Sequence, residues 1–398
     1  MNQIKIEIHS WLSNDGPAAL TFRRQLVPVE GKQAWIFPPT FAQNESADDE
    51  EEGSGGNYQI DSLPEGDPNR NVCLIDSIGS QANRIEPVFK REPYSKLVPR
   101  RVVTVANGDT VDILDVGHRA ADAAIRFSKE LGPKVWEAFH LIKTKRDYSK
   151  LVSLAPTSLV FGVWDSRGTG VKVQRIVKST IRAYNVTTAR RSATYQAAYE
   201  YVENGLIDPS FDKGSGKSNP LSQEGFKYSL ATGTHGGVQV RGEIWQEAMI
   251  NLVALRTLTD DSNLKRYLLG LSLVALSFRD QTTFNLREGC LLRAATEKDF
   301  EGLWNRVDFN GTETPVELTH NQAIAYTQLA VDKVSFEPVG AVEFDKQTAE
   351  AWLTIDKKRR KTLAKKSHPA NAVVEEATKA RTKSAKESKA GEGQAAPQ

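Results

Sequence analysis

The sequence predicts an α+β fold, because it contains both strand-like and helix-like patterns of apolar residues. Ile4, Ile6 and Ile8 alternate with charged residues, which is typical of a half-buried strand. Residues 158–191 are dense in Val, Ile and Thr, which favours a second extended region. Residues 264–278 are apolar nearly all round and predict a buried helix.

Two further segments have helical spacing. Residues 115–142 predict two helices joined by a tight break at Gly132-Pro133. Residues 242–258 predict a helix that begins near Glu243 and places four apolar residues on one face: Ile244, Ala248, Leu252 and Leu255.

Composition and charge set the domain organisation. The 398 residues, 39% of them hydrophobic, can fill a core, so we expect the chain to fold on its own. The formal charge of +2 hides two biased segments: residues 45–52 carry six acids and no base, and residues 356–398 carry twelve bases and five acids. We expect one domain over residues 1–355, with a disordered acidic loop near 44–57, followed by a basic, mostly disordered tail over 356–398.

The sequence favours a cytoplasmic location. Cys73 and Cys290 are the only cysteines, which is too few for a disulfide framework and lacks metal-ligand spacing. The first residues do not resemble a signal peptide, and the longest apolar run, residues 267–278, is too short to span a bilayer. We therefore expect neither secretion nor contact with a membrane.

Residues 74–87, LIDSIGSQANRIEP, combine many short polar side chains with a single cation. No nucleophile with its base is present in this window. By themselves these residues indicate a polar junction without a defined purpose.

A basic stretch is the most informative feature of the sequence. Residues 161–191 hold seven bases against the single acid Asp165. A helix and a strand each place bases on one face and apolar residues on the other, and the many β-branched residues favour the strand. Such a row of cations suits a polyphosphate backbone, because a merely solvated face normally mixes acids with bases. Its bases are Arg167, Lys172, Arg175, Lys178, Arg182, Arg190 and Arg191.

Two glycine-rich stretches could add anion contacts. In WDSRGTG, Gly168 and Gly170 could let the main chain approach a phosphate that Arg167 also binds, although a plain hairpin turn has the same composition. In ATGTHGGVQVRG, residues 231–242, a loop leading into the expected helix could bind an anion with help from His235 and Arg241.

Catalytic motifs are weak or incomplete. GSGKS, residues 214–218, has Phe211 where a nucleotide-binding loop needs glycine, and Asn219-Pro220 disfavours the helix that should follow. The histidines have no paired spacing, and no G-x-S-x-G stretch is present. Asp76 and Asp165 could each hold a divalent ion, but a lone carboxylate is thin support for a metal site. We expect no metal and no cofactor.

Several collinear motifs within residues 70–290 resemble the backbone subunit of the type I-G (formerly type I-U) CRISPR Cascade complex, in the RAMP superfamily. They are DSIGSQANRIEP, DVGHRAADAAIRFS, PTSLVFGVWDSRGTGVKVQRIVKSTIRAYNV and VRGEIWQEAMINLVAL. The resemblance implies a modified RRM or ferredoxin-like palm with inserted finger and thumb elements. It does not cover the acidic loop or the basic tail.

The resemblance also implies a function without catalysis. Copies of such a subunit stack along one CRISPR RNA, present it for pairing with target DNA, and work with other Cascade subunits and a recruited helicase-nuclease. Leu74 and Ile75 would then end a strand, Ser80 would cap the next helix, and Gln81, Asn83 and Arg84 would face the sugar-phosphate chain.

The family's FG motif corresponds to Phe161 and Gly162, and the basic stretch that follows would continue the palm. The strands lack the aromatic signature of RNA stacking, so we expect phosphate contacts to dominate. A protein that accepts any spacer should leave sequence readout to base pairing. Two alternatives remain: a backbone subunit that also cleaves bound target RNA through a metal-binding aspartate, and a nucleotide-driven enzyme built around GSGKS.

Overall fold

The computed structural model describes residues 8–41, 57–62, 70–215, 218–278 and 281–379. The acidic loop expected near residues 44–57 lies outside these ranges except for Asn57, whose backbone pairs with that of Phe41. The strand expected at Ile4 and Ile6 also lies outside. Ile8 is part of a helical turn, so an extended conformation at this residue is wrong; its buried side chain joins the core in that turn.

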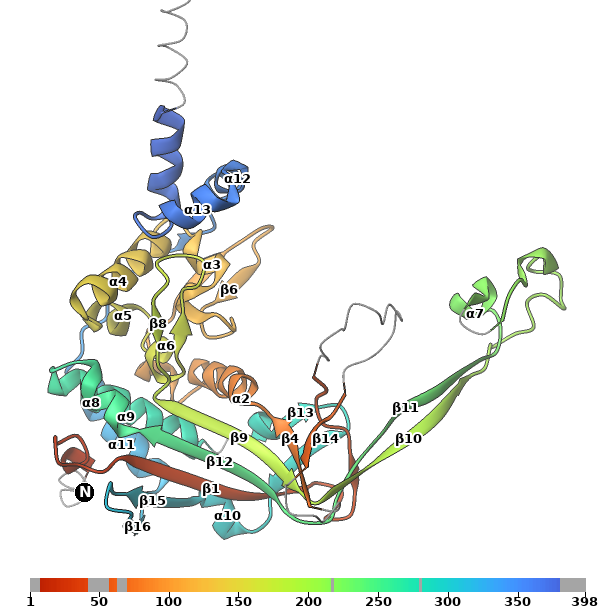
Figure 1. Cartoon of the computed structure of the whole chain (residues 1–398), viewed down its shortest axis with the longest axis horizontal. Coiled ribbons are helices and arrows are strands. Elements are labelled where there is room, and N and C mark those ends of the chain that lie inside the picture. The colour runs from red at the N-terminus through yellow and green to blue at the C-terminus, as the bar shows by residue number, and fades with distance from the viewer. Residues whose placement is uncertain (1–7, 42–56, 63–69, 216–217, 279–280, 380–398) are drawn as a thin grey trace, which may run out of the picture.

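Within the described residues, nine strands form an antiparallel sheet at the centre of the molecule (Figure 1). Five of them lie side by side in the order β1 (Ala19–Pro28), β12 (Ile244–Asn251), β9 (Val177–Tyr184), β4 (Asn71–Asp76) and β3 (Gln59–Ser62). The other edge of β1 pairs with β14 (Cys290–Ala294) and β15 (Leu303–Val307), which pair in turn with β13 (Asn285–Arg287) and β16 (Glu313–Val316). The mixed α+β class is therefore confirmed.

Helices pack on one face of the sheet and build the main core with it. They are α8 (Leu252–Leu258), α9 (Ser262–Ser277) and α11 (His320–Val331). Apolar side chains of β1 and β12, including Leu20, Phe22 and Ile250, belong to the same buried cluster as the leucines of α9. The prediction of a buried helix at residues 264–278 is confirmed, since α9 is buried from Tyr267 to Ser277.

The helix expected over residues 242–258 is wrong in its first half. Residues 244–251 form β12, in which buried and half-buried side chains alternate, and only residues 252–258 are helical. Ile244 and Ala248 fit a helical face by spacing, but they are also an even number of residues apart and therefore share one face of a strand. Pairing with β1 on one side and β9 on the other decides for the strand.

Between β4 and β9 the chain is mainly helical. Its elements are α2 (Ile78–Ile85), η1 (Glu86–Lys90), η2 (Ser95–Leu97), η3 (Arg119–Ala121), α3 (Ala123–Arg126), α4 (Leu131–Lys145), α5 (Ser149–Leu154) and α6 (Thr157–Val160). The two helices expected within residues 115–142 correspond to α3 and α4, but the break falls before Leu131. Pro133 is instead in the first turn of α4, where a missing backbone N–H costs no helical hydrogen bond.

Smaller pieces of sheet accompany this region. They are a three-stranded sheet of β5 (Val102–Thr104), β6 (Thr110–Asp112) and β17 (Val342–Glu343), and a hairpin of β7 (Val163–Trp164) and β8 (Lys172–Val173). Two short helices, η6 (Gln281–Phe284) and α10 (Glu297–Glu301), flank β13 and β14.

A long two-stranded ribbon, here called the arm (residues 186–240), leaves the sheet between β9 and β12 and extends far from the remaining fold (Figure 1). It consists of β10 (Val186–Tyr195) and β11 (Ser229–Val240), with η4 (Pro209–Phe211) and α7 (Pro220–Gln223) near its tip and β2 (Trp35–Ile36) paired at its base. The expected loop over residues 231–242 is therefore wrong: most of it is strand β11, because it pairs with β10.

The region after residue 355 is more ordered than expected. It contains α13 (Lys357–Leu363) and a helical segment over residues 369–379, preceded by α12 (Lys346–Thr354). Leu363, Ala364 and Ala372 are buried with Phe127 and Trp352, so a few small apolar residues are enough to anchor this segment. The expectation of a mostly disordered tail is wrong for residues 357–379, and the rest of that tail lies outside the described residues.

Candidate nucleic-acid interface

The polar window at residues 74–87 forms the end of β4 and helix α2. Leu74 and Ile75 lie near the end of the strand, as expected. The cap of the helix is Ser77, whose backbone is extended and whose hydroxyl accepts a hydrogen bond from the Ser80 backbone N–H at 3.3 Å. The expected cap at Ser80 is wrong, because Ser80 is already inside the helix.

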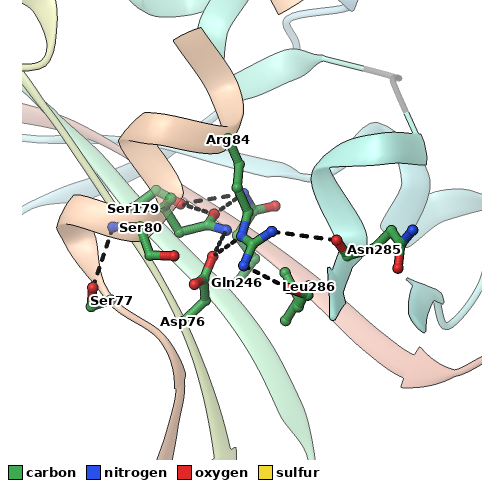
Figure 2. A network of polar contacts seen from close by, with 9 residues as sticks. Asp76, Ser77, Ser80, Arg84, Ser179, Gln246, Asn285 and Leu286 are labelled. Carbon is green, nitrogen blue, oxygen red and sulfur yellow. Dashed lines mark hydrogen bonds and ion pairs between the residues drawn. The ribbon is translucent and has the colours of Figure 1, made fainter. Parts of the chain in front are cut away.

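A polar network joins α2 to the sheet (Figure 2). The side chain of Gln81 is buried within this network. Its side-chain amide donates to Asp76 Oδ2 at 2.6 Å, and its carbonyl oxygen accepts from Ser179 Oγ at 2.9 Å and Gln246 Nε2 at 3.2 Å. Gln81 is only 1% exposed. The expectation that it faces a sugar-phosphate chain is wrong, because its polar atoms are used inside the protein.

Arg84 completes the same network. Its Nε donates to Asp76 Oδ2 at 3.1 Å, and its two terminal nitrogens donate to the backbone carbonyls of Asn285 and Leu286 at 3.3 and 2.7 Å (Figure 2). Asp76 is itself 1% exposed, and a buried acidic side chain is costly without a nearby partner of opposite charge. Arg84 therefore fastens α2 to β4 and β13, which limits its availability to an RNA.

Asn83 contacts a second buried network, centred on Arg119. Arg119 donates to Glu86 at 2.6 Å, to Asn83 Oδ1 at 3.3 Å and to the backbone carbonyl of Gly162 at 3.4 Å. Burial raises the pKa of Glu86 to about 7, while the neighbouring Arg119 acts to lower it. Asn83 itself is exposed, so of the four predicted α2 residues it has the most access to solvent.

Gly162, in the predicted FG motif, lies at the close approach of two segments. Its φ is +79°, and a Cβ at this position would lie 2.4 Å from Arg175 Cγ. A side chain would therefore meet both a strained backbone and a clash. Arg175 is half-buried beside it, and desolvation and the charge of Arg119 lower its pKa. Arg119 thus contacts both helix α2, through Asn83, and the FG motif, through Gly162.

The strand interpretation of the basic stretch is confirmed for β9. Ser179 faces Gln81 and α2, and side chains alternate along a strand, so Lys178 and Arg182 project from the opposite face of the sheet. The structure therefore does not bring Arg84 and Lys178 to one surface.

The sheet face opposite the helices, here called the open face, collects cations and aromatic rings. Strand register places Lys178 opposite Met249 and Arg182 opposite Trp245. The members of this face with printed contacts are Arg23, Thr180, Arg182, Tyr184, Trp245 and Glu247. The face offers planar rings and charged groups side by side, and this combination can bind a flexible polyanion with aromatic bases.

Glu247 organises the cations of the open face. Arg23 and Arg182 approach its carboxylate at 3.2 and 3.6 Å, and the Tyr184 hydroxyl donates to it at 3.1 Å. The Arg23 guanidinium also lies over the Trp245 ring, 4.4 Å from its centroid. Arg23 and Arg182 keep 48% and 40% of their side chains exposed, so both can still contact a ligand.

Sequence reasoning missed Arg23 and Trp245. Trp245 was placed on a helix, although the alternation in EIWQEAMIN contained the signal of a strand with Trp245 and Glu247 on one face. The expectation that phosphate contacts dominate without base stacking rested on strands without aromatic residues. That premise is wrong for this sheet, because Trp245 and Tyr184 lie on its open face.

The β7–β8 hairpin holds two more predicted residues. Lys172 lies 5.5 Å from the Trp164 ring centroid, and Arg167 is exposed in the turn. The backbone N–H groups of Gly168, Thr169 and Gly170 all donate to Asp165, to either its backbone or its carboxylate oxygens. The hairpin-turn alternative is therefore correct, because the turn leaves none of these three N–H groups for a phosphate.

The remaining predicted residues lie on the arm or at its base. Arg190 pairs across the ribbon with His235, whose ring lies 4.8 Å from that of Tyr58. Arg191 lies 5.9 Å from the Trp35 ring centroid, and Arg241 is exposed where the arm returns to the sheet. The anion site expected at a loop-to-helix junction here is wrong, because β11 leads into β12 and no helix begins at this point.

The residues considered for catalysis are used in structural contacts. Asp165 is 3% exposed and accepts hydrogen bonds from the Thr169 backbone and hydroxyl at 2.6 and 2.8 Å. The part of the chain that the structure describes contains no group of three His, Cys, Asp or Glu residues that could hold a metal ion.

The GSGKS motif is only partly described, because residues 216–217 lie outside the described ranges. A short helix, α7, does follow it, contrary to expectation. Asn219 caps this helix and Pro220 occupies its first position, where proline is tolerated.

A comparison with known protein families finds one match. Residues 20–188, which include nearly all of β1, the whole of α2 and most of the basic stretch, match the family described as CRISPR-associated protein GSU0053 (Cas_GSU0053). The matched segment is therefore similar to a CRISPR-associated family. The predicted resemblance to a CRISPR-Cas subunit is confirmed at this level. No curated protein matches the chain.

The matched segment ends within β10, so most of the arm and the C-terminal helices lie beyond the match. In the described parts of this protein, no helix has both the length and the apolar character needed to cross a bilayer.

Proposed function

We propose that this protein is a non-catalytic backbone subunit of a type I-G Cascade complex, which binds the sugar-phosphate chain of CRISPR guide RNA and presents it for pairing with target DNA. The observation that carries the proposal is the open face, where Arg23, Lys178 and Arg182 lie among the rings of Trp245 and Tyr184. The match of residues 20–188 to a CRISPR-associated family supports the same role.

The chemistry of the open face suits a guide that varies in sequence. Cations contact phosphates whatever the base, and an aromatic ring stacks on any base. Stacking on Trp245 and Tyr184 would supplement the phosphate contacts expected from the basic stretch.

The sheet topology supports a palm with an inserted element. β1 lies between β12 on one side and β14 and β15 on the other, and β9 follows β12. The arm is inserted between the neighbouring antiparallel strands β9 and β12. This order is compatible with the RRM or ferredoxin-like palm that the resemblance implies, and the arm corresponds to one of its inserted elements.

Exposed apolar residues near the tip of the arm support self-association along the guide. They include Tyr195, Tyr199, Leu206, Phe211, Phe226, Tyr228 and Leu230, with Leu206 66% exposed. Several exposed large apolar side chains on one projecting element are typical of a protein contact. Under the proposal, the tip of one copy contacts the next copy along the RNA, and other Cascade subunits and a recruited helicase-nuclease complete the assembly.

The proposal is tested by measuring binding to two guide RNAs with unrelated spacers at several salt concentrations. Lys178→Ala should weaken binding equally for both guides and reduce the slope of log affinity against log salt by about one. Trp245→Ala should weaken binding by roughly 1–3 kcal/mol and leave the slope unchanged, because a stacked ring releases no counterion.

Lys333→Ala is the matched control, because this exposed lysine follows α11 on the helical side of the sheet. It should change neither affinity nor slope. If the Lys178 and Trp245 variants bind like the parent, or if their losses depend on the spacer, the open face is not the guide-binding surface.

Cleavage of bound target RNA is the alternative. It requires a metal at Asp76 or Asp165, yet both carboxylates are nearly fully buried and accept internal hydrogen bonds. We therefore expect complementary RNA to remain intact in the assembled complex with magnesium or manganese. Metal-dependent cutting that Asp165→Asn abolishes would replace the non-catalytic proposal.

A further inference from the structure

A pocket of about 790 Å³ lies where the C-terminal helices meet the remaining fold. Figure 1 shows α12 and α13 beside α3, at the end of the molecule away from the arm. The pocket walls come from α3, the β7–β8 turn, α12 and α13. Its volume is within the range of small-molecule sites.

The charged side chains that line the pocket are all bases. They are Arg126, Arg167, Lys357, Arg360, Lys361 and Lys365. Within the described residues, no Asp or Glu belongs to the lining. Grouping six cations without an acid has an electrostatic cost, which a bound anion would remove.

Helix α13 sorts its bases between two sides. Lys357, Arg360 and Lys361 are three and four residues apart and line the pocket. Arg359 is not part of the lining and pairs with Glu376 at 2.6 Å. The helix therefore holds Arg359 in a solvent-exposed ion pair with Glu376, while its neighbour Arg360 lines the pocket.

Arg126 supplies a second, independent observation. Its Nε is buried without a hydrogen-bond partner among the described residues, and its guanidinium lies 4.9 Å from the Phe127 ring centroid. Desolvation is the main cause that lowers the pKa of Arg126, Asp165 acts to raise it, and Arg167 acts to lower it. A buried N–H donor that faces no acceptor is costly unless a ligand completes its bonding.

Apolar side chains form another part of the pocket wall. Phe127, Phe344, Trp352 and Leu353 contribute to it, and Leu353 is 67% exposed. An inorganic anion would leave this wall unused. A nucleotide satisfies both parts of the pocket, because its phosphates can meet the cations while its planar base lies against the apolar side chains.

We propose that this pocket binds a phosphorylated nucleotide, either free or at the end of a nucleic-acid strand. The site is separate from the open face, and the proposal does not require guide RNA to bind there. Arg126, Arg167 and Arg360 would contact phosphate oxygens, and Leu353 with the aromatic side chains would contact the base.

The test is a titration of the full chain with four probes: AMP, inorganic pyrophosphate, and a tetrathymidylate with and without a 5′-phosphate. Binding is measured by calorimetry at low salt. AMP or the phosphorylated tetranucleotide should bind at least about tenfold more tightly than pyrophosphate, because only they use the apolar wall. Tighter binding of the tetranucleotide identifies a strand end, whereas equal binding identifies a free nucleotide, and both outcomes support the proposal.

The matched variants lie on one helix. Arg360→Gln should weaken nucleotide binding about tenfold or more, whereas Arg359→Gln, on the other side of α13, should leave it unchanged. Arg167→Gln provides a second pocket variant outside this helix. Pyrophosphate that binds as well as the nucleotides, absence of binding by every phosphorylated probe, or equal losses in the Arg359 and Arg360 variants would overturn the proposal. Guide binding through Lys178 is measured separately, so failure here leaves the proposed function intact.

Discussion

At the scale of single residues, polar side chains of residues 74–87 form a buried hydrogen-bond network. Asp76 is buried at the end of β4, and a buried carboxylate needs donors and a nearby positive charge. Gln81 and Arg84, one and two helical turns along α2, supply them. The many polar residues of this window indicated a polar junction, but Asp76, Gln81 and Arg84 form hydrogen bonds with one another inside the protein.

This network predicts a stability effect for Arg84. Arg84→Ala should lower the free energy of unfolding by about 2 kcal/mol, because it leaves Asp76 buried beside a single neutral donor. Arg84→Lys should retain little of this stability, since an ammonium group cannot reproduce the three directed hydrogen bonds of the guanidinium. Urea unfolding measures both variants.

Asn83→Ala is the comparison within the same helix, because Asn83 is exposed and accepts one long hydrogen bond. Asn83→Ala should lower the free energy of unfolding by less than Arg84→Ala does. If the Arg84→Ala protein has unchanged stability but binds the guide more weakly, Arg84 contacts RNA and does not stabilise the fold.

At the scale of elements, the docking of the C-terminal helices depends on a buried histidine. His368 is 3% exposed; its Nε2 lies 2.8 Å from the Arg126 carbonyl oxygen, and its Nδ1 accepts the Ala370 backbone N–H at 3.3 Å. Both contacts suit the neutral ring with its proton on Nε2. Protonation of Nδ1 would remove the acceptor of the Ala370 N–H.

Burial lowers the pKa of His368 below its ordinary value. Above the pKa of the unfolded chain, about 6.5, the ring is neutral in both states and its contribution to stability is fully present. As the pH falls below that value, the unfolded chain takes up the proton more readily, and this stability is lost. We expect amide hydrogen exchange in residues 369–379 to become faster between pH 7.5 and 5.5, beyond the chemical effect of pH.

His368→Gln is the control for this prediction, because glutamine does not titrate in this range. The variant should show weaker protection at pH 7.5 and a smaller change on acidification. Equal pH dependence in the two proteins would place the sensitive group elsewhere.

At the scale of the whole molecule, the arm is structurally separate from the main core. The sheet and its helices form the main core without it, and the arm leaves from between two neighbouring strands. Its exposed apolar tip contributes nothing to that core. Under the proposed function, the sheet binds RNA while the tip of the arm contacts another copy.

This separation predicts that a variant of the arm tip forms multimers less well but still binds RNA. Leu206→Ser combined with Phe211→Ser should weaken multimer formation on a long guide RNA about tenfold or more, because two exposed apolar anchors are removed. Affinity for an RNA that spans only one copy should stay unchanged. Native mass spectrometry counts the copies on each RNA.

Phe309→Ser is the matched control, since Phe309 is 73% exposed but lies outside the arm. It should form multimers like the parent protein. If the tip variant assembles normally, the contact between copies uses another surface.

The sequence by itself determined the α+β class, the buried helix α9, the strand character of β9 and the likeness to a CRISPR-Cas subunit. These features depend on local periodicity and on motifs that are contiguous in the chain. Tertiary structure alone decided which face each side chain occupies. Pairing with β1 and β9 made residues 244–251 a strand and placed Trp245 beside Arg23, and the packing of α2 on β9 turned Gln81 inward while Lys178 points outward. The physical reason is that partners distant in the sequence supply the hydrogen bonds and the buried area that choose between locally similar alternatives.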